Sequence, residues 1–230
     1  FTVTQQMKDV FVSRGISPEK IRVVLNAPEE KFLYTGQLTP PDHPKNDGFV
    51  LICHGAIEER YGLDTVLEAV SLARSQIPNL RLKILGKGTY VTRLLELRKQ
   101  LQLEDCVEYL GYVPLEQMNE ELQAATVGIV AQKSSSYSNL VHTGKMYDYI
   151  AFGKPIIASR LKATEAYFDD KALAYFEPSN AQSLANAIID LYDHPEKGEE
   201  YVRNARELYL KYCWESQKEI YLSAYHELLS

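Results

Sequence analysis

The stretch Thr143-Gly-Lys-Met-Tyr-Asp-Tyr-Ile-Ala-Phe-Gly-Lys-Pro-Ile-Ile-Ala-Ser159 decides the fold of this chain. It predicts a short helix that stops at Gly153, followed by a buried strand entered through Pro155. Lys145 and Asp148 are three residues apart and therefore share one face of that helix. A cation and a carboxylate at the start of a helix indicate an anion site with a hydroxyl-binding acid.

A polar run without apolar periodicity, Ser134-Ser-Ser-Tyr-Ser-Asn139, precedes this stretch. Such a run predicts a loop that presents backbone N–H groups to a ligand. Together with the helix that follows, it makes Lys133, Lys145 and Asp148 the strongest set of candidate residues. The alternative for the same three residues is a solvated helix face.

Outward from this stretch, apolar strands alternate with amphipathic helices. The expected strands are 49–54, 80–85, 107–110, 127–130, 155–158 and 173–175, and the expected helices between them are 63–75, 92–101, 115–125 and 164–168. Alternation of this kind predicts an α/β fold, a Rossmann-like doubly wound parallel sheet with helices on both faces. The continuous apolar run Phe49-Val-Leu-Ile-Cys53 supports burial of the strands on both sides.

The whole chain, residues 1–230, is expected to form a single Rossmann-like domain. Residues 1–48 are a lead-in and linker, with a buried strand at Phe1–Val3, a helix from Gln5 to Arg14 capped by Thr4, a second strand ending near Asn26 and a Pro-rich hinge. Residues 49–178 form the core sheet and 179–230 the closing helices. The abrupt start suggests a fragment of a longer protein.

Composition restricts the class of protein. Thirty-one acidic against 25 basic residues give a net charge of −6, which argues against a nucleic-acid partner. Three cysteines without a CxxC pair favour free, buried thiols in a reducing compartment over disulfides or zinc. Because no apolar run approaches the roughly 20 residues of a membrane span and no signal peptide opens the chain, we expect no transmembrane segment and a cytoplasmic location.

Loops that follow strands should meet at one edge, because ligands of open parallel sheets bind at the carboxyl ends of the strands. Gly55 follows the first core strand and leads through Arg60 to a helix, which suits a phosphate-approach loop but also an ordinary turn with solvated charges. Gly86 and Gly88 form a weaker signal, since a turn can need glycine without a ligand. His54 is either a catalytic base at a strand end or a polar rim residue.

Taken together, these segments resemble the C-terminal half of glycosyltransferase family 4, retaining enzymes of the GT-B fold. The resemblance rests on motifs along nearly the whole chain: Gly55…Gly62-Leu-Asp…Leu67-Glu-Ala69, Leu82-Lys-Ile-Leu-Gly-Lys-Gly88, Val107-Glu-Tyr-Leu-Gly-Tyr-Val113 and Asp148-Tyr-Ile-Ala-Phe-Gly-Lys-Pro-Ile-Ile-Ala-Ser159. It implies a donor-binding domain whose partner, an N-terminal acceptor domain, is absent from this chain.

The resemblance also implies roles for residues. Main-chain groups around Tyr112 and Val113 would hold the nucleobase, and Asp148 would bind the ribose hydroxyls. The diphosphate would be bound by the backbone N–H groups of Thr143, Gly144 and Lys145. Arg60 and Lys145 would stabilise the leaving diphosphate by preorganised charge, so that neither a metal nor another cofactor is implied.

Three positions depart from the pattern of the family. Leu140 stands where a first acid is expected, so the sugar contact would come from Asn139 or His142, and the second acid is Asp148 rather than Glu. Ala56 and Tyr61 replace an Arg and a Lys of the glycine loop, which leaves Arg60 as the nearest substitute.

The resulting expectation is a hexosyltransferase that uses a UDP-sugar and acts on a glycan or lipid-linked acceptor, as in polysaccharide biosynthesis, with peripheral membrane contact of the full enzyme. The fragment alone should be inactive, because half of the cleft is missing. Two alternatives stay open: a nucleotide-sugar epimerase half of GT-B architecture, and a non-catalytic binding module whose site has decayed.

Overall fold

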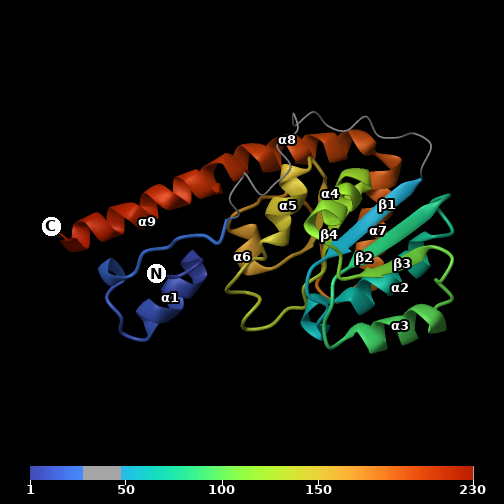
Figure 1. Ribbon diagram of the computed structural model, residues 1–230, viewed down its shortest axis with the longest axis horizontal. Coiled ribbons are helices and arrows are strands. Elements are labelled where there is room, and N and C mark those ends of the chain that lie inside the picture. The colour runs from blue at the N-terminus through green and yellow to red at the C-terminus, as the bar shows by residue number, and fades with distance from the viewer. Residues whose placement is uncertain (28–47, 230) are drawn as a thin grey trace.

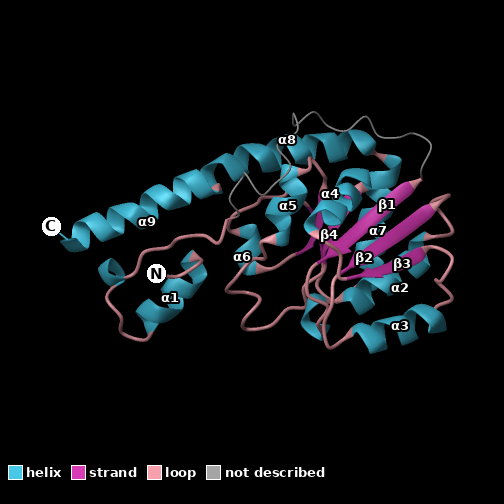
Figure 2. Ribbon diagram, in the orientation of Figure 1, coloured by secondary structure: helices cyan, strands magenta, loops and turns pink. Residues whose placement is uncertain are grey.

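A six-stranded, fully parallel sheet forms the centre of the computed structural model, which describes residues 1–27 and 48–229 (Figures 1 and 2). Its strands are β1 (Phe49–His54), β2 (Leu80–Leu85), β3 (Val107–Gly111), β4 (Val127–Val130), β5 (Ile156–Ser159) and β6 (Ala174–Phe176). Their order is β3-β2-β1-β4-β5-β6, so the chain runs outward from β1 and then returns to β1's other side. This order confirms the expected Rossmann-like doubly wound sheet.

Helices cover both faces of the sheet. One face packs against α2 (Leu63–Ala73), α3 (Val91–Gln100) and α7 (Ala181–Asp193), and the other against α4 (Leu115–Ala124), α5 (Lys145–Ala151) and α8 (Pro195–Tyr212). All six residues of β1 are buried, with Leu51 facing the first layer and Ile52 the second. This double burial explains why the strands are continuously apolar.

The stretch from Thr143 to Ser159 folds as expected. Helix α5 ends at Ala151, and Gly153 follows with a left-handed φ of 63° while its N–H donates to the carbonyl of Ile150 at 3.0 Å. Glycine adopts this conformation without steric cost, so the chain can turn directly into β5. The short helix α6 (Lys162–Glu165) then leads towards β6.

The expected strands at residues 1–3 and near residue 26 are wrong. Thr2 and Val23 form only an isolated parallel bridge, and Phe1 is 58% exposed. Among residues 1–27 and 48–229 the two segments pair only with each other, and a two-stranded pair without further strands is marginal. The helix between them is confirmed as α1 (Gln5–Ser13), with Thr4 Oγ1 accepting a hydrogen bond from the Met7 N–H at 3.2 Å, and the 3₁₀ helix η1 (Pro18–Lys20) follows it.

This N-terminal segment packs on the long C-terminal helix α9 (Trp214–Leu229), away from the sheet (Figure 1). The N–H of Leu25 donates to Oε1 of the buried Gln217 at 2.8 Å. The ring of Phe1 lies 5.0 Å from that of Tyr221, centroid to centroid. The first and last described segments are therefore held together by side chains of α9.

Three further expectations concern the linker, the cysteines and transmembrane segments. The expected linker falls largely on residues 28–47, which lie outside the described residues. All three cysteines are free; Cys53 and Cys213 are buried, whereas Cys106 is only half-buried. Within the described residues, no helix combines the length and the apolar character that crossing a membrane requires.

Candidate functional site

The loops after the first four strands meet at the carboxyl edge of the sheet, as expected. The Gly55 N–H donates to the carbonyl of Leu85 at 2.9 Å, and the Gly86 N–H donates to that of Gly111. These backbone bonds tie the ends of β1, β2 and β3 together. The strand order of the sheet reverses between β1 and β4, which are parallel, and there a pocket opens whose walls include Gly55, Tyr61, Thr143 and Lys145.

Gly86 and Gly88 are required by the close approach of two loops. A Cβ atom on Gly86 would lie 1.8 Å from the carbonyl oxygen of Gly55, and one on Gly88 would lie 2.0 Å from that of Ile57. Both distances are far inside van der Waals contact. The glycines therefore have a structural reason to be present, and direct contact between them and a ligand stays a prediction.

Lys145, on the first turn of α5, reaches across the sheet edge to the loop after β1. Its side chain passes over Gly55, where an added Cβ would lie 2.6 Å from Lys145 Cε. Burial lowers the pKa of Lys145 to about 8, an effect that Cys53 and Asp148 oppose and Arg60 reinforces. Lys145 is thus a partly desolvated cation beside the pocket, and such a cation attracts an anion more strongly than one in bulk water.

Tyr61 lies between the two cations of the site. The Lys145 Nζ is 4.0 Å from the centroid of its ring, and the Arg60 Cζ is 4.9 Å from the same centroid. Tyr61 and Arg60 belong to the short 3₁₀ helix η3 (Glu59–Tyr61), and Arg60 is exposed. The structure therefore brings Arg60 and Lys145 to one aromatic ring, a role for Tyr61 that the sequence analysis missed.

Asp148 faces the end of β1. Its Oδ2 lies 3.5 Å from Nε2 of His54, and its side chain is 23% exposed. Burial raises the pKa of Asp148 to about 7, although Lys145 lowers it. Burial also lowers the pKa of His54 to about 3, and Lys145 lowers it further. Asp148 is consequently a carboxylate near its ionisation midpoint at neutral pH, next to an uncharged imidazole.

Thr143 and Gly144 form the entry to α5. Within the described part of the chain, neither of their backbone N–H groups donates a hydrogen bond, whereas the Lys145 N–H makes a long one of 3.5 Å to Thr143 Oγ1. Free N–H groups at a helix entry can bind an anion. Their contact with a diphosphate stays a prediction.

Asn139 and His142 are engaged within the protein. Asn139 Nδ2 donates to the hydroxyl of Ser134 at 3.0 Å, and its Oδ1 accepts from the N–H of Lys162 at 3.1 Å. His142 Nε2 lies 2.7 Å from the Tyr147 hydroxyl, and its ring lies 4.8 Å from that of Tyr167. Neither side chain is free as it stands to contact a sugar, so that role stays a prediction.

Tyr112 and Val113 follow β3, at the outer side of the same edge. The ring of Tyr112 is 73% exposed, with Lys87 Nζ 4.8 Å from its centroid, while Val113 packs partly against the layer of α4 and α5. An exposed ring beside main-chain groups can accept a flat ligand. Recognition of a nucleobase here is a prediction.

Lys133 does not join Lys145 and Asp148. Its Nζ makes an ion pair with Asp64 at 2.6 Å and lies 3.8 Å from Glu59 Oε1. A cation with two carboxylates is already neutralised locally. Lys133, which lies in the loop between β4 and α5, is thus paired within the protein, and a part for it in ligand binding stays a prediction.

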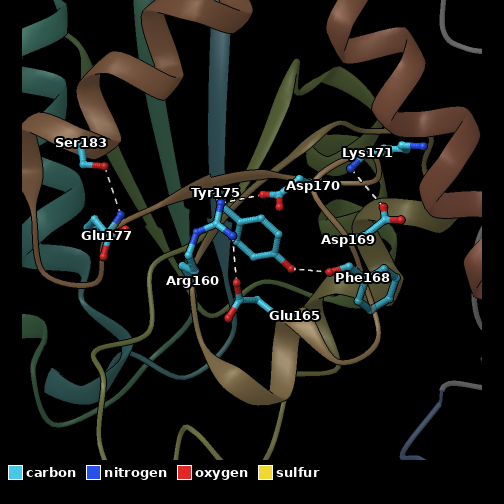
Figure 3. A network of polar contacts seen from close by, with 9 residues as sticks. All are labelled: Arg160, Glu165, Phe168, Asp169, Asp170, Lys171, Tyr175, Glu177 and Ser183. Atoms are coloured by element: carbon cyan, nitrogen blue, oxygen red, sulfur yellow. Dashed lines mark hydrogen bonds and ion pairs between the residues drawn. The ribbon is translucent and has the colours of Figure 1, made fainter.

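A polar network at the end of β5 was missed by the sequence analysis (Figure 3). Arg160 donates to Glu165 at 2.8 Å and to Asp170 at 2.6 Å, and its Cζ lies 4.5 Å from the centroid of the Tyr175 ring. Tyr175 in turn donates to the carbonyl of Phe168 at 2.7 Å. The network braces the loop between β5 and β6, and it leaves Arg160 paired rather than available to an anion.

In residues 1–27 and 48–229, no three His, Cys, Asp or Glu side chains are grouped to hold a metal.

Most of this chain matches a family of known proteins. The sequence model of the family "Glycosyl transferases group 1" matches residues 36–208. A D-inositol 3-phosphate glycosyltransferase of Acidothermus cellulolyticus is 26% identical over 100% of this chain and 52% of its own length. The chain thus spans about half the length of this relative.

Solved structures share the fold. Anabaena Alr3699/HepE, in complex with UDP and glucose, has a TM-score of 0.80 at 17% identity, over 99% of this chain and 62% of its own. The pneumococcal O-GlcNAc transferase GtfA, in complex with UDP and GlcNAc, has a TM-score of 0.79 at 19% identity, over 99% of this chain and 44% of its own. At these identities the likeness shows the fold alone, the Rossmann-like half of GT-B glycosyltransferases.

Proposed function

The chain belongs to the group 1 glycosyl transferases, and from this premise we propose that it is the donor-binding half of a retaining hexosyltransferase. The donor would be a UDP-sugar and the acceptor a glycan or a lipid-linked sugar. An N-terminal domain outside this chain would bind the acceptor, and transfer would take place in the cleft between the two halves. The D-inositol 3-phosphate glycosyltransferase supports this division, because the chain matches only 52% of its length.

One observation carries the proposal. At the topological switch of the sheet, a partly buried cation and a partly buried carboxylate lie on the first turn of α5, and the cation, Lys145, lines a pocket between the ends of β1 and β4. A nucleoside diphosphate offers what these two groups need: negative phosphate oxygens for Lys145 and hydroxyl donors for Asp148. UDP in two of the solved structures that share the fold supports uridine as the base.

In the proposed reaction, the bond between the sugar and the diphosphate breaks while the acceptor oxygen attacks the same face of the sugar. Negative charge then grows on the phosphate oxygen that leaves. Lys145 and Arg60 are held near each other by the Tyr61 ring before the reaction, so they stabilise this charge with little rearrangement. The departing oxygen takes the proton of the acceptor, and the bond count stays balanced.

Calorimetric titration with UDP, UDP-glucose, GDP and ADP tests donor binding by this chain. We expect UDP and UDP-glucose to bind, and Lys145→Met or Asp148→Asn to weaken binding at least about 10-fold, as loss of a hydrogen bond to a charged group does. Lys99→Met, on the exposed side of α3, is the matched control and should leave the affinity unchanged.

Equal affinity of the parent and Asp148→Asn would remove Asp148 from the site. No binding of any nucleotide by the parent would favour a decayed binding module. Transfer itself is tested with the full-length protein, UDP-glucose and a glycan acceptor, and the expected products are UDP and a glucosylated acceptor whose new glycosidic bond keeps the anomeric configuration of the donor.

A further inference from the structure

His54 carries a buried polar atom that the protein leaves unpaired. Its side chain is 5% exposed, and within the described residues Nε2 makes no hydrogen bond of normal length. Every other residue of β1 is apolar, and an apolar side chain here would avoid the cost of desolvating an imidazole. A buried polar group without a partner therefore needs an explanation.

The orientation of the His54 ring is fixed by its neighbours. The ring meets that of Tyr149 edge to face, with centroids 5.0 Å apart. Tyr149 is itself held by a hydrogen bond of 3.1 Å from its hydroxyl to the carbonyl of Ile52, and it fills the space above Gly128, where a Cβ would lie 2.4 Å from Tyr149 Cγ. As a result, Nε2 of His54 is aimed at Oδ2 of Asp148, 3.5 Å away.

We propose that His54 is a positioning residue whose Nε2–H holds the carboxylate of Asp148, so that the remaining oxygen of Asp148 can accept the ribose hydroxyls of a nucleoside diphosphate. The inference rests on the proposed function, because it assigns His54 a part in the same site. At 3.5 Å, a small approach of the carboxylate when ligand binds completes the hydrogen bond. His54 acts through Asp148 and does not touch the reacting atoms.

The charges around Asp148 suit this role. The groups that face it are His54 from β1 and Lys145 and Tyr149 from α5, with Arg60 of η3 acting on Lys145. Because burial holds the pKa of His54 at about 3, its ring is uncharged near pH 7 and donates without adding a second cation. An N–H donor favours the ionised form of a carboxylate, and the pKa of Asp148, about 7, makes its ionisation sensitive to such a donor.

The first experiment needs no ligand. The carboxyl carbon of Asp148 is titrated by NMR in the 230-residue chain, with Asp148→Asn to assign the signal. His54→Leu removes the donor, whereas His54→Gln has a similar size and keeps an amide N–H. We expect the Asp148 midpoint to rise by about half a unit to one unit in His54→Leu, and to stay within a few tenths of the parent in His54→Gln.

His226→Leu, an exposed position on α9, is the control for replacing a histidine and should shift nothing. A midpoint in folded His54→Leu equal to that of the parent would overturn the inference. Should His54→Leu fail to fold, nitrogen NMR of the parent decides the point: the Nε2–H tautomer of His54 is expected, and the Nδ1–H tautomer would overturn the proposal.

The second experiment measures UDP affinity against pH in the same proteins. In His54→Leu the fall in affinity on the acid side should begin at higher pH, with a loss of about 3- to 10-fold near pH 6.5 that disappears near pH 8. An equal loss at every pH would indicate a merely structural role and overturn the inference. Absence of UDP binding by the parent would count against the proposed function, while the titration without ligand would still decide whether His54 holds Asp148.

Discussion

The ammonium of Lys145 lies over the ring of Tyr61, with Nζ 4.0 Å from the ring centroid. The two residues come from different layers of the edge, α5 and the loop after β1, and the ring also lies 4.9 Å from Arg60 Cζ. An aromatic face stabilises each cation without neutralising it. The ring therefore keeps both positive charges available to an anion.

Removing this ring should weaken diphosphate binding. We expect Tyr61→Leu to lower UDP affinity by about 3- to 10-fold, since a cation on an aromatic face gains about 0.5–2 kcal/mol. Tyr61→Phe keeps the ring and should bind as the parent does. Calorimetry at low and high salt measures both variants, and a Leu variant that matches the parent would show that Tyr61 does not position the cations.

Binding of UDP should pass through a maximum between about pH 7 and pH 8. Below the pKa of Asp148, about 7, the carboxylate is protonated and accepts hydroxyls less well. Above the pKa of Lys145, about 8, the ammonium loses its charge and with it the attraction to phosphate. Affinity is measured by calorimetry across this range of pH.

Asp148→Asn separates the two limbs of this profile. It should abolish the part of the acid limb that comes from protonation of Asp148. The part that comes from protonation of UDP itself should remain, because it is the same for both proteins. It should also move the alkaline limb to lower pH, because Asp148 raises the pKa of Lys145. An unchanged alkaline limb would mean that the two side chains do not interact.

His142 should make the fold sensitive to acid. Burial lowers the pKa of His142 to about 4 from an ordinary value of 6.5, so the unfolded chain binds a proton in a range where the folded protein does not. Stability is therefore lost as the pH falls from about 6.5 towards 4, by about 2 kcal/mol between pH 7 and pH 5.

His142→Phe keeps an aromatic ring among Tyr147, Tyr167 and Phe168 and has no proton to gain. Urea denaturation of the parent and of this variant at the two pH values gives the difference, in which the contributions of Asp148 and His54 cancel. An equal loss of stability in both proteins would contradict the assignment of the acid sensitivity to His142.

Gly86→Ala should destabilise the protein by at least about 3 kcal/mol, because the new Cβ would meet the carbonyl oxygen of Gly55, which cannot move without displacing β1. The φ of Gly86, 135°, adds backbone strain. Gly144→Ala is the matched control, with a φ of −63° and no atom closer than 4.0 Å to the new Cβ, and should change stability by less than about 0.5 kcal/mol. Equal unfolding free energies of the two variants would contradict this account.

Much of the fold could be predicted because its signals are local. The apolar run of β1, the stop at Gly153 and the capping residue Thr4, whose Oγ1 accepts from the Met7 N–H at 3.2 Å, each act within a few residues. The failure at residues 1–3 has the opposite cause. A strand there would have needed partners elsewhere in the chain, and apolar residues alone do not supply them.

The same difference applies to the site. The face shared by Lys145 and Asp148 follows from helical spacing, so it could be predicted. The pairs His54–Asp148 and Tyr61–Lys145 join residues from different elements, and only the register of β1 beside β4 and the position of α5 bring them together. Lys133 is grouped with Lys145 and Asp148 in the sequence, because its ion pair with the distant Asp64 cannot be predicted from local spacing.

The hydrogen bond from Leu25 to Gln217 affects the order in which the protein can fold during synthesis. Residues 1–27 leave the ribosome long before α9 does, yet Leu25, Arg22 and Phe1 all bind side chains of that helix. Thr4 and Gln5 can already contact the Leu140 carbonyl and the Tyr167 hydroxyl, but the contacts with α9 cannot form until that helix emerges, whereas the sheet can form from strands that follow one another closely. The N-terminal segment should therefore become fully protected from a protease only after α9 has left the ribosome.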